Sequence, residues 1–356
     1  MLCFIIDDQL TNLPAAPLQQ NSGRGAVGNR AGRYEQYAVE AEDDGWPTEL
    51  DKLPPLRTAV GRNTSKSIII QNSSPDIFFD TSINPYRGCE HGCVYRFARP
   101  THAWLGLSPG LDFESRLFTK ENAAELLKQE LAAKGYGPKL IAIGTNTHPY
   151  QPIERKLRIM RDILEVLRDI DLLQDVAAEQ LVQVTILVTA LDKSMARTME
   201  PRAASRHQRI AAIRKLADTN IPVAVNVAPV VPGLTDHELD QILTKAADAG
   251  AMAARYILLR SPLEVKDLFD KWLTACYPDR RSKVLSLIRS ARGGKLNDAN
   301  FGIRMAGGGA YAKKGRDRFR SARSRLILNP RDEDAWLDTS KFIALKLPGS
   351  QMTVDL

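Results

Sequence analysis

Two cysteines four residues apart, Cys89 and Cys93, are the residues of this chain whose type and spacing best suit metal chemistry. They lie in the glycine-flanked stretch RGCEHGCVYRFARPTHAW, and Tyr95 follows them closely. A cysteine at position 96 would complete a motif that binds an iron–sulfur cluster, but residue 96 is arginine. A guanidinium is permanently charged and has no lone pair to donate, so it cannot replace a thiolate. The stretch therefore predicts an impaired iron–sulfur site.

Zinc is the alternative metal for the same stretch. Thiolate and imidazole ligands are available there from Cys89, His91, Cys93 and His102. Their spacing does not match the patterns of structural zinc sites, which makes zinc the weaker interpretation. A third interpretation is that the two thiols are packed in a loop and have no function.

Composition indicates an ordinary globular protein. The chain has 356 residues, of which 44% are hydrophobic and 26% charged, enough for a sizeable core. Four cysteines, Cys3 and Cys276 being the other two, are too few and too scattered for a disulfide framework. The opening stretch MLCFIIDDQL lacks a basic region and the length of a signal peptide, and no stretch has the apolar length of a membrane span. We expect a cytoplasmic protein with no membrane contact.

Positive charge is concentrated near the C-terminus. The net charge is +7, and residues 289–331 hold 12 Lys and Arg against 2 acidic residues. The segment YAKKGRDRFRSARSRLIL (311–328) places Tyr311, Phe319, Ala322 and Leu326 on one face of a helix. It predicts a helix packed on the body of the protein. Its basic face, Lys313–Arg325, is a candidate for salt-dependent contact with DNA or RNA.

Apolar strands alternate with amphipathic helices from Asp76 onward, which predicts a parallel sheet covered by helices. Strands are expected at 76–83, 139–147, 181–192, 221–236 and 254–260, and helices at 120–135, 153–167, 206–220 and 236–250. Such an α/β chain forms a partial TIM-like barrel, with its chemistry at the C-terminal ends of the strands.

The alternation skips once, because the helix at 153–167 is followed directly by 168–180, which also has a helical pattern. The barrel is therefore expected to lack one strand, leaving unpaired backbone groups at the opened edge. We divide the chain into an irregular N-terminal tail or arm (1–60), the barrel (61–262), a C-terminal helical extension with the basic segment (263–330) and a second tail (331–356).

Five stretches occur in order at sensible spacing: the cysteine stretch extended through LGLSPGLDFES, then GTNTHPYQPIERK, ARTMEPRAAS, VAPVVPGLTDHE and VLSLIRSARGGKLND. Together they resemble the radical S-adenosylmethionine (radical SAM) proteins related to spore photoproduct lyase. The resemblance runs from about Arg24 to Leu328. It implies a partial (β/α)6 barrel with a C-x3-C-x2-C loop after the first strand. Three thiolates there hold a 4Fe–4S cluster whose fourth iron binds SAM.

The resemblance also implies the reaction. An electron from a donor such as a flavodoxin or ferredoxin cleaves SAM and releases a 5′-deoxyadenosyl radical, which abstracts hydrogen from a substrate. The substrate is unknown, with nucleic acid as the candidate because spore photoproduct lyase acts on DNA. No catalytic residue beyond the cofactor ligands is identified.

The family's functional positions can be carried to this chain one at a time. Cys89 and Cys93 match the first two cluster ligands, and Tyr95 matches an aromatic residue near the adenine of SAM. The turn Gly144, Thr145 and Asn146 falls where the family contacts the amino-acid part of SAM. Later strand ends add residues that would line the ribose and adenine, namely Thr189, Asn226 and Gly233.

Three departures from the family point toward impaired chemistry. Arg96 stands at the third ligand position, one barrel strand is missing, and His148 stands where the family usually has aspartate. The first interpretation is a radical SAM enzyme, impaired in this chain. The alternative is a cluster-free nucleic-acid-binding pseudoenzyme that keeps the basic C-terminal helix. A third is the unstable product of a decayed gene.

Overall fold

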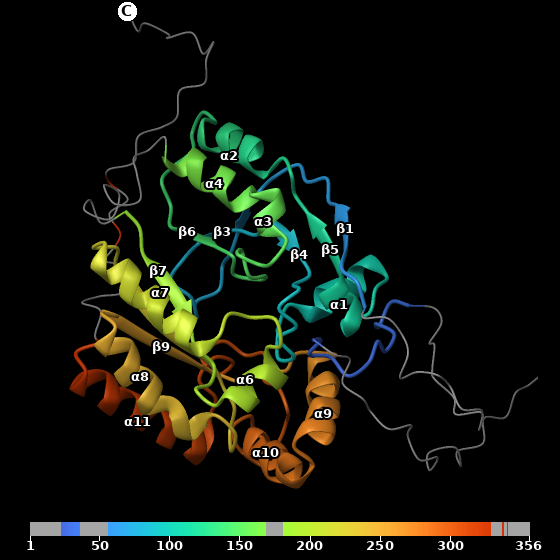
Figure 1. Ribbon diagram of the computed structural model, residues 1–356, viewed down its shortest axis with the longest axis vertical. Coiled ribbons are helices and arrows are strands. Elements are labelled where there is room, and N and C mark those ends of the chain that lie inside the picture. The colour runs from blue at the N-terminus through green and yellow to red at the C-terminus, as the bar shows by residue number, and fades with distance from the viewer. Residues whose placement is uncertain (1–22, 36–55, 169–180, 329–336, 338–339, 341–356) are drawn as a thin grey trace, which may run out of the picture.

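The computed structural model describes residues 23–35, 56–168, 181–328, 337 and 340 (Figure 1). Cys3, the expected helical stretch 169–180 and nearly all of the expected tail 331–356 lie outside the described residues. Within the described part, strands and helices mix along the chain as expected of an α/β protein.

The described strands form three sheets of three strands each. In the first sheet the strand order is β1 (Ala59–Arg62), β5 (Arg116–Thr119), β4 (Tyr86–Arg87). In the second it is β2 (Ile69–Gln71), β3 (Thr81–Ile83), β6 (Ile141–Ile143). In the third it is β7 (Val184–Leu187), β8 (Val223–Val230), β9 (Ala253–Leu258). The third sheet is entirely parallel, and β3 pairs with β6 in parallel. The pairs β2–β3 and β4–β5 are antiparallel.

Helices cover the outer faces of these sheets (Figure 1). Their bounds are α1 (Leu111–Ser115), α2 (Ala123–Leu131), α3 (Glu154–Leu157), α4 (Ile159–Arg168), α6 (Lys193–Met199), α7 (Arg206–Asp218), α8 (Leu239–Asp248), α9 (Val265–Cys276), α10 (Pro278–Ser290) and α11 (Gly309–Arg325), with 3-10 helices η3 (Arg99–Leu105) and η4 (Asp236–Glu238). The local sequence determines where two of these helices begin. Ser205 and Gln208 form a capping box at α7, and Asp192 accepts a hydrogen bond from the Met195 amide at α6.

The largest core lies between the β7–β8–β9 sheet and its covering helices. Alternate residues of β8, Val223, Val225 and Val227, are buried against the apolar faces of α8 and α11. Phe319 of α11 packs on Tyr256 of β9 with ring centroids 4.7 Å apart. Strand periodicity thus fixes which face of the sheet is covered and leaves the opposite face toward the interior of the fold.

The expected strand at 76–83 is wrong in its first half, because only Thr81–Ile83 forms β3. Asp76 accepts from the Gly302 amide at 2.6 Å and pairs with the Arg304 guanidinium at 2.6 Å. These bonds to a distant loop hold the segment before β3 in turns and bends. The expected helix at 153–167 is divided at Arg158, which has φ of +56°, into α3 and α4, and α4 continues to Arg168. The strand expected at 254–260 begins one residue earlier, as β9, and the remaining expected strands and helices up to residue 250 are present with shorter bounds.

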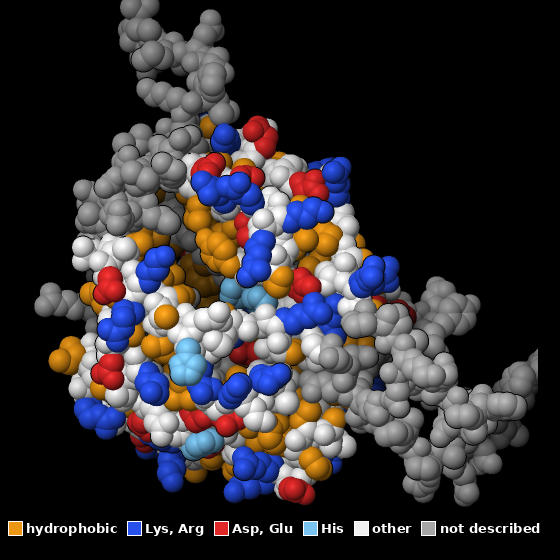
Figure 2. All heavy atoms as spheres, in the orientation of Figure 1, with side chains coloured by type: hydrophobic (Ala, Val, Ile, Leu, Met, Phe, Trp, Pro, Cys, Tyr) orange, Lys and Arg blue, Asp and Glu red, His pale blue; other side chains and the backbone are white. Residues whose placement is uncertain are grey.

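The β2–β3–β6 and β7–β8–β9 sheets are not joined into one. β6 and β7 belong to different sheets, and no strand lies between α4 and β7 among the residues that the structure describes. Figure 2 shows a hollow near the centre of this face, with apolar side chains in its wall and histidine beside it. The described fold is therefore a mixed α/β arrangement without a closed barrel, and the partial barrel stays a prediction.

A buried ion pair ties the N-terminal segment to the cysteine loop. Arg99 and Glu114 are fully buried and paired, and Arg99 Nε also donates to the carbonyl of Cys93 at 3.0 Å. The Glu114 carboxylate accepts from the amides of Gly25 at 2.9 Å and Ala26 at 2.8 Å. The described segment beginning at residue 23 therefore packs onto the cysteine loop.

The basic C-terminal segment forms α11, as expected. Phe319 and Ala322 are buried and Tyr311 and Leu326 are partly buried, so the predicted apolar face is confirmed. Tyr311 also donates to Asp236 at 2.6 Å. In the described part of the chain, no helix is long and apolar enough to cross a membrane.

Replacing Glu114 with Gln tests the buried ion pair. The change keeps the side-chain size but leaves the buried Arg99 without a balancing charge, so we expect the free energy of unfolding to fall by about 3–5 kcal/mol. Equilibrium urea unfolding measures it. Glu121→Gln is the control, because the side chains of its pair with Arg62 are 43% and 83% exposed and the loss should stay under about 1 kcal/mol. Equal losses in the two variants would contradict the argument.

Candidate cofactor site at the cysteine loop

The cysteine loop connects β4 to η3 and is held by backbone hydrogen bonds at both ends. The Cys89 amide donates to the Phe113 carbonyl at 2.9 Å, and the Val94 amide donates to the Met199 carbonyl at 3.1 Å. Gly92 has φ of +68°, and a side chain there would also press on the Glu114 carboxylate, 2.9 Å from the Cβ position. The loop can therefore hold its shape without a bound metal.

Both thiols of the loop are buried, Cys89 with 2% and Cys93 with 9% exposed. Burial, together with the nearby Glu200 and Cys89, raises the pKa of Cys93 to about 12. In the protein alone this thiol is therefore protonated at neutral pH. Only a strongly cationic ligand would favour its thiolate form.

The described residues give no support to the zinc interpretation of the loop. Among the residues that the structure describes, no three His, Cys, Asp or Glu side chains are placed to hold a metal ion. His102 is fully buried and its Nε2 lies 2.9 Å from the Arg116 carbonyl. Its ring packs on Phe113 with centroids 5.0 Å apart. His102 therefore belongs to the core next to α1.

Two histidines meet beside the thiols. The rings of His91 and His148 are 4.6 Å apart, edge to face. Burial, followed by nearby Arg96, lowers the pKa of His91 to about 4, and burial, followed by His91, lowers that of His148 to about 3. Nδ1 of His148 accepts from the Tyr150 amide at 3.1 Å, which places the proton of the neutral ring on Nε2. Both rings are neutral at pH 7.

The turn after β6 is organised by Asn84, which follows β3. Asn84 Oδ1 accepts from the Asn146 amide at 2.8 Å, and its Nδ2 donates to Thr145 Oγ1 at 3.1 Å. Gly144 has φ of +78°, and a Cβ there would lie 2.4 Å from Pro149 Cδ. Only glycine fits this position, so the three predicted residues Gly144, Thr145 and Asn146 form one preset turn.

Arg96 joins the cysteine loop to this turn. Its Nε donates to the carbonyl of Asn146 at 3.1 Å. No other hydrogen bond or salt bridge of the Arg96 side chain is present in the described part of the chain. The two terminal nitrogens of the guanidinium are therefore left for an external partner, next to the thiols and His91.

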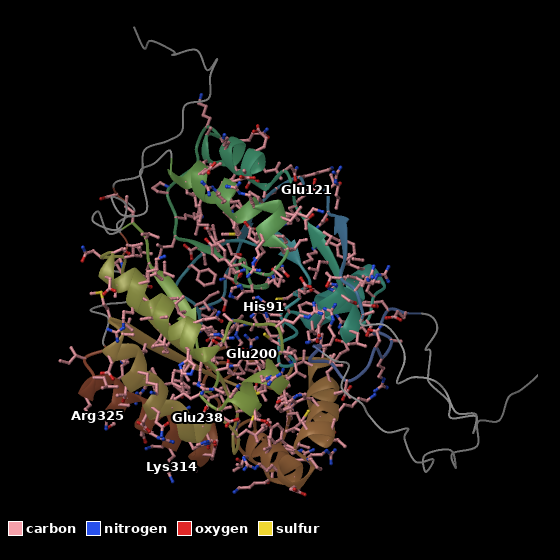
Figure 3. All side chains as sticks on the ribbon, in the orientation of Figure 1. His91, Glu121, Glu200, Glu238, Lys314 and Arg325 are labelled. Atoms are coloured by element: carbon pink, nitrogen blue, oxygen red, sulfur yellow. The ribbon has the colours of Figure 1, made fainter. Side chains whose placement is uncertain are left out.

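Tyr95 and Thr189 meet in a buried polar network centred on Glu200. The Tyr95 hydroxyl donates to Glu200 and lies 3.2 Å from Thr189 Oγ1, which is itself 2.8 Å from the carboxylate. Arg209 of α7 closes the network through a 2.6 Å salt bridge to Glu200. In Figure 3, His91 and Glu200 lie near one another at the middle of the molecule. Burial, followed by Cys93 and Glu200, raises the pKa of Tyr95 well above its usual range.

Glu200 and Arg209 were missed as site residues from the sequence. Glu200 falls inside the stretch ARTMEPRAAS, which carried part of the family resemblance, so the stretch itself was the available signal. Its partner Tyr95 is 105 residues away along the chain, and no local pattern predicts such a contact.

The last two predicted residues are placed differently from the others. Asn226 lies on β8 opposite Leu187 of β7, and its Oδ1 is buried without a hydrogen-bond partner in the described structure. Gly233 follows β8 with φ of +75°, and a Cβ there would lie 3.2 Å from Leu287 of α10. Asn226 remains a group able to bind a ligand, whereas Gly233 contacts the helical extension.

Comparison with known proteins identifies the family. The family model of the radical SAM superfamily matches residues 83–246, which include the cysteine loop and the turn after β6. An uncharacterized protein of Mycobacterium tuberculosis is 33% identical over 230 residues, covering 59% of this chain and 68% of that protein. An uncharacterized protein of Methanocaldococcus jannaschii is 27% identical over 172 residues, covering 44% of this chain and 62% of that protein.

Tyr95→Phe tests the network around Glu200. The variant keeps the ring but removes the hydroxyl that donates to a buried carboxylate, so we expect unfolding to require about 1–3 kcal/mol less free energy. Urea unfolding followed by circular dichroism measures the change. In the control Tyr150→Phe the ring is 57% exposed, and the effect should stay within about 0.5 kcal/mol. A Tyr95→Phe effect no larger than the control would show that the hydroxyl contributes nothing.

Proposed function

The chain belongs to the radical SAM superfamily, and we propose that it binds SAM but, as its sequence stands, lacks a complete 4Fe–4S site and does not cleave SAM. We further propose that it derives from the group related to spore photoproduct lyase and that its strands correspond to a partial barrel. The five stretches that resemble this group support the assignment.

Superfamily membership implies a 4Fe–4S cluster, held by thiolates, and SAM, from which the reduced cluster generates an organic radical. The donor set of this chain does not fit that cluster. Cys89 and Cys93 supply two thiols, and the next side chain in the ligand series is the Arg96 guanidinium. A guanidinium offers no lone pair to iron. No step through a cluster is therefore assigned to the chain as written.

The contact between Arg96 and Asn146 is the observation that carries the proposal. It places a cation between the two thiols and the turn that would bind the amino-acid part of SAM. A carboxylate is the partner that suits the two free guanidinium nitrogens, because Arg pairs with carboxylates through parallel hydrogen bonds. We propose that Arg96 holds the SAM carboxylate in place of the missing iron. Asn84 would keep the turn in its binding shape.

The remaining predicted contacts complete the proposed SAM site. Tyr95 would pack near the adenine, held by Glu200 and Thr189. Asn226, with its unpartnered buried oxygen, would accept a hydrogen bond from the ribose or adenine.

Arg96→Cys tests the account of the cluster, with Arg96→Ser as the matched control that removes the cation without adding a thiolate. After anaerobic reconstitution with iron and sulfide, we expect a full cluster only in Arg96→Cys, because only that variant has the third thiolate. Iron and sulfide content and visible absorbance measure it. Release of 5′-deoxyadenosine from SAM after chemical reduction, or by a flavodoxin or ferredoxin, then scores activity.

Two other outcomes of this reconstitution experiment would change the account of the cluster. A cluster in Arg96→Ser or in the unchanged chain would contradict the ligand argument and require another donor. No cluster in any of the three proteins would mean that Arg96 is not the sole defect, and the opened sheet would become the cause to examine.

Nucleic-acid binding by α11 is the second candidate function, favoured by three exposed cations. Lys314, Arg320 and Arg325 are exposed and have no salt bridge within the described residues, whereas Arg318 pairs with Asp240 and Lys313 with Asp317 at 2.7 Å. Figure 3 shows Lys314 and Arg325 at the edge of the molecule. Phosphates are the partners that unpaired surface arginines contact readily.

Replacing Lys314, Arg320 and Arg325 together with Gln tests this second function. If α11 contacts phosphates, affinity for a DNA or RNA oligonucleotide should fall at least about tenfold. The slope of log affinity against log salt concentration should also become shallower, by the amount expected for the loss of about three phosphate contacts. Fluorescence anisotropy at several salt concentrations measures both. The control replaces three exposed lysines elsewhere, Lys66, Lys128 and Lys134, with Gln. Equal losses of affinity in the two triple variants would show that binding depends on the net charge of the protein and not on α11.

A further inference from the structure

A cavity of about 250 Å³ borders the turn after β6. It is lined by β2, the end of β3, β4, η3 and the residue after β5, including Arg87, Thr101, Trp104, Lys120, Asn146 and Thr147. Neither cysteine of the loop and none of Tyr95, Thr189 and Glu200 lines it. Asn84 and Asn146 border both sites.

Lys120 is the unusual residue of this cavity. The residue is only 6% exposed, yet its side chain has no hydrogen bond or salt bridge among the described residues. The backbone fixes its position, because the Lys120 amide donates to the Pro85 carbonyl at 2.9 Å, next to the β4–β5 pair. The Lys120 Nζ is not one of the side-chain nitrogens that the described structure closes off from solvent without a partner, so the ammonium is accessible and can pair with an anion in the cavity.

A second cation faces the same space. Arg87 of β4 also lines the cavity, and its side chain has no hydrogen bond or salt bridge in the described part of the chain. Arg87 and Lys120 line the same cavity. Burial, followed by the charge of Arg87, lowers the pKa of Lys120, and Glu130, which accepts from the Ile68 and Ile69 amides, raises it. The lining includes no Asp or Glu. Two unpaired cations and no acid make the cavity selective for an anion.

The other lining groups suit a phosphate attached to a ring. The Asn146 side chain makes no hydrogen bond within the described residues and can donate or accept. Trp104 is 68% exposed although Tyr34 packs on it with centroids 4.9 Å apart. An exposed indole beside two cations offers a surface on which a base can stack.

We propose that the cavity between Arg87, Lys120 and Trp104 is a phosphate-binding site that takes the phosphate of a nucleotide. The ammonium and guanidinium hold the phosphate oxygens, Asn146 donates a further hydrogen bond, and Trp104 contacts the base. This site does not depend on cluster or SAM binding, so it holds equally for an active or an inactive member of the superfamily. Free inorganic phosphate shares the same chemistry and is separated from a nucleotide by the test.

Isothermal titration of the full chain with inorganic phosphate, with deoxynucleoside monophosphates and with the nucleosides lacking phosphate tests the site. Lys120→Met keeps the length of the side chain and removes the charge, and Arg87→Gln removes the second, exposed cation with little risk to folding. Each change should weaken binding of the monophosphates at least about tenfold, since each removes a charge-assisted hydrogen bond. Lys128→Met, at an exposed position of α2, is the matched control and should bind as the unchanged chain does.

The relative affinities of phosphate, monophosphates and nucleosides distinguish the possible outcomes. The nucleotide is supported if monophosphates bind more tightly than inorganic phosphate and if this difference is lost in Trp104→Leu, which removes the aromatic face on which a base would stack. Phosphate and monophosphates of equal affinity would overturn the role of Trp104 while keeping the anion site. The proposal falls if Lys120→Met and Arg87→Gln bind as Lys128→Met does, or if nucleosides without phosphate bind as well as monophosphates.

Discussion

The buried pair of Arg99 and Glu114 is the interaction on which the geometry of the site depends. Arg99 donates to the Cys93, Pro109 and Gly110 carbonyls at 3.0, 3.0 and 2.9 Å as well as to the carboxylate. Because every partner is removed from water, the pair stabilises the loop only if all of these bonds form together. The cysteine loop, the segment after Gly23 and α1 are therefore fixed as one unit, with or without a cofactor.

Because this loop keeps its shape without a metal, an arginine at position 96 can remove a cluster ligand without unfolding the loop. In a site whose shape depended on its metal, losing a ligand would also disorder the loop. Here the loop is held by Arg99, by the Met199 carbonyl and by the Phe113 carbonyl. The chemistry can therefore be lost while the fold is kept. A folded protein that retains binding is therefore favoured over the unstable product of a decayed gene.

The sequence was informative where the structure depends on local pattern. The valine-rich β8 was predicted because it is a continuous apolar run, and α8 and α11 because apolar residues recur along them every three to four residues. β4 has two residues and β1 is largely exposed, so neither carries a readable pattern. The cysteines and the Gly144–Asn146 turn were found through motifs. Glu114, Glu200 and Lys120 were not, because their roles come from partners or cavities assembled by distant segments.

The central claim is that this chain has a site for SAM without a site for a complete cluster. Electron paramagnetic resonance of the reconstituted and reduced chain, recorded with and without SAM, tests it most directly, together with equilibrium dialysis of radiolabelled SAM against the same protein. The account predicts SAM binding with no 4Fe–4S signal that SAM alters. A reduced 4Fe–4S signal that shifts when SAM is added would contradict it.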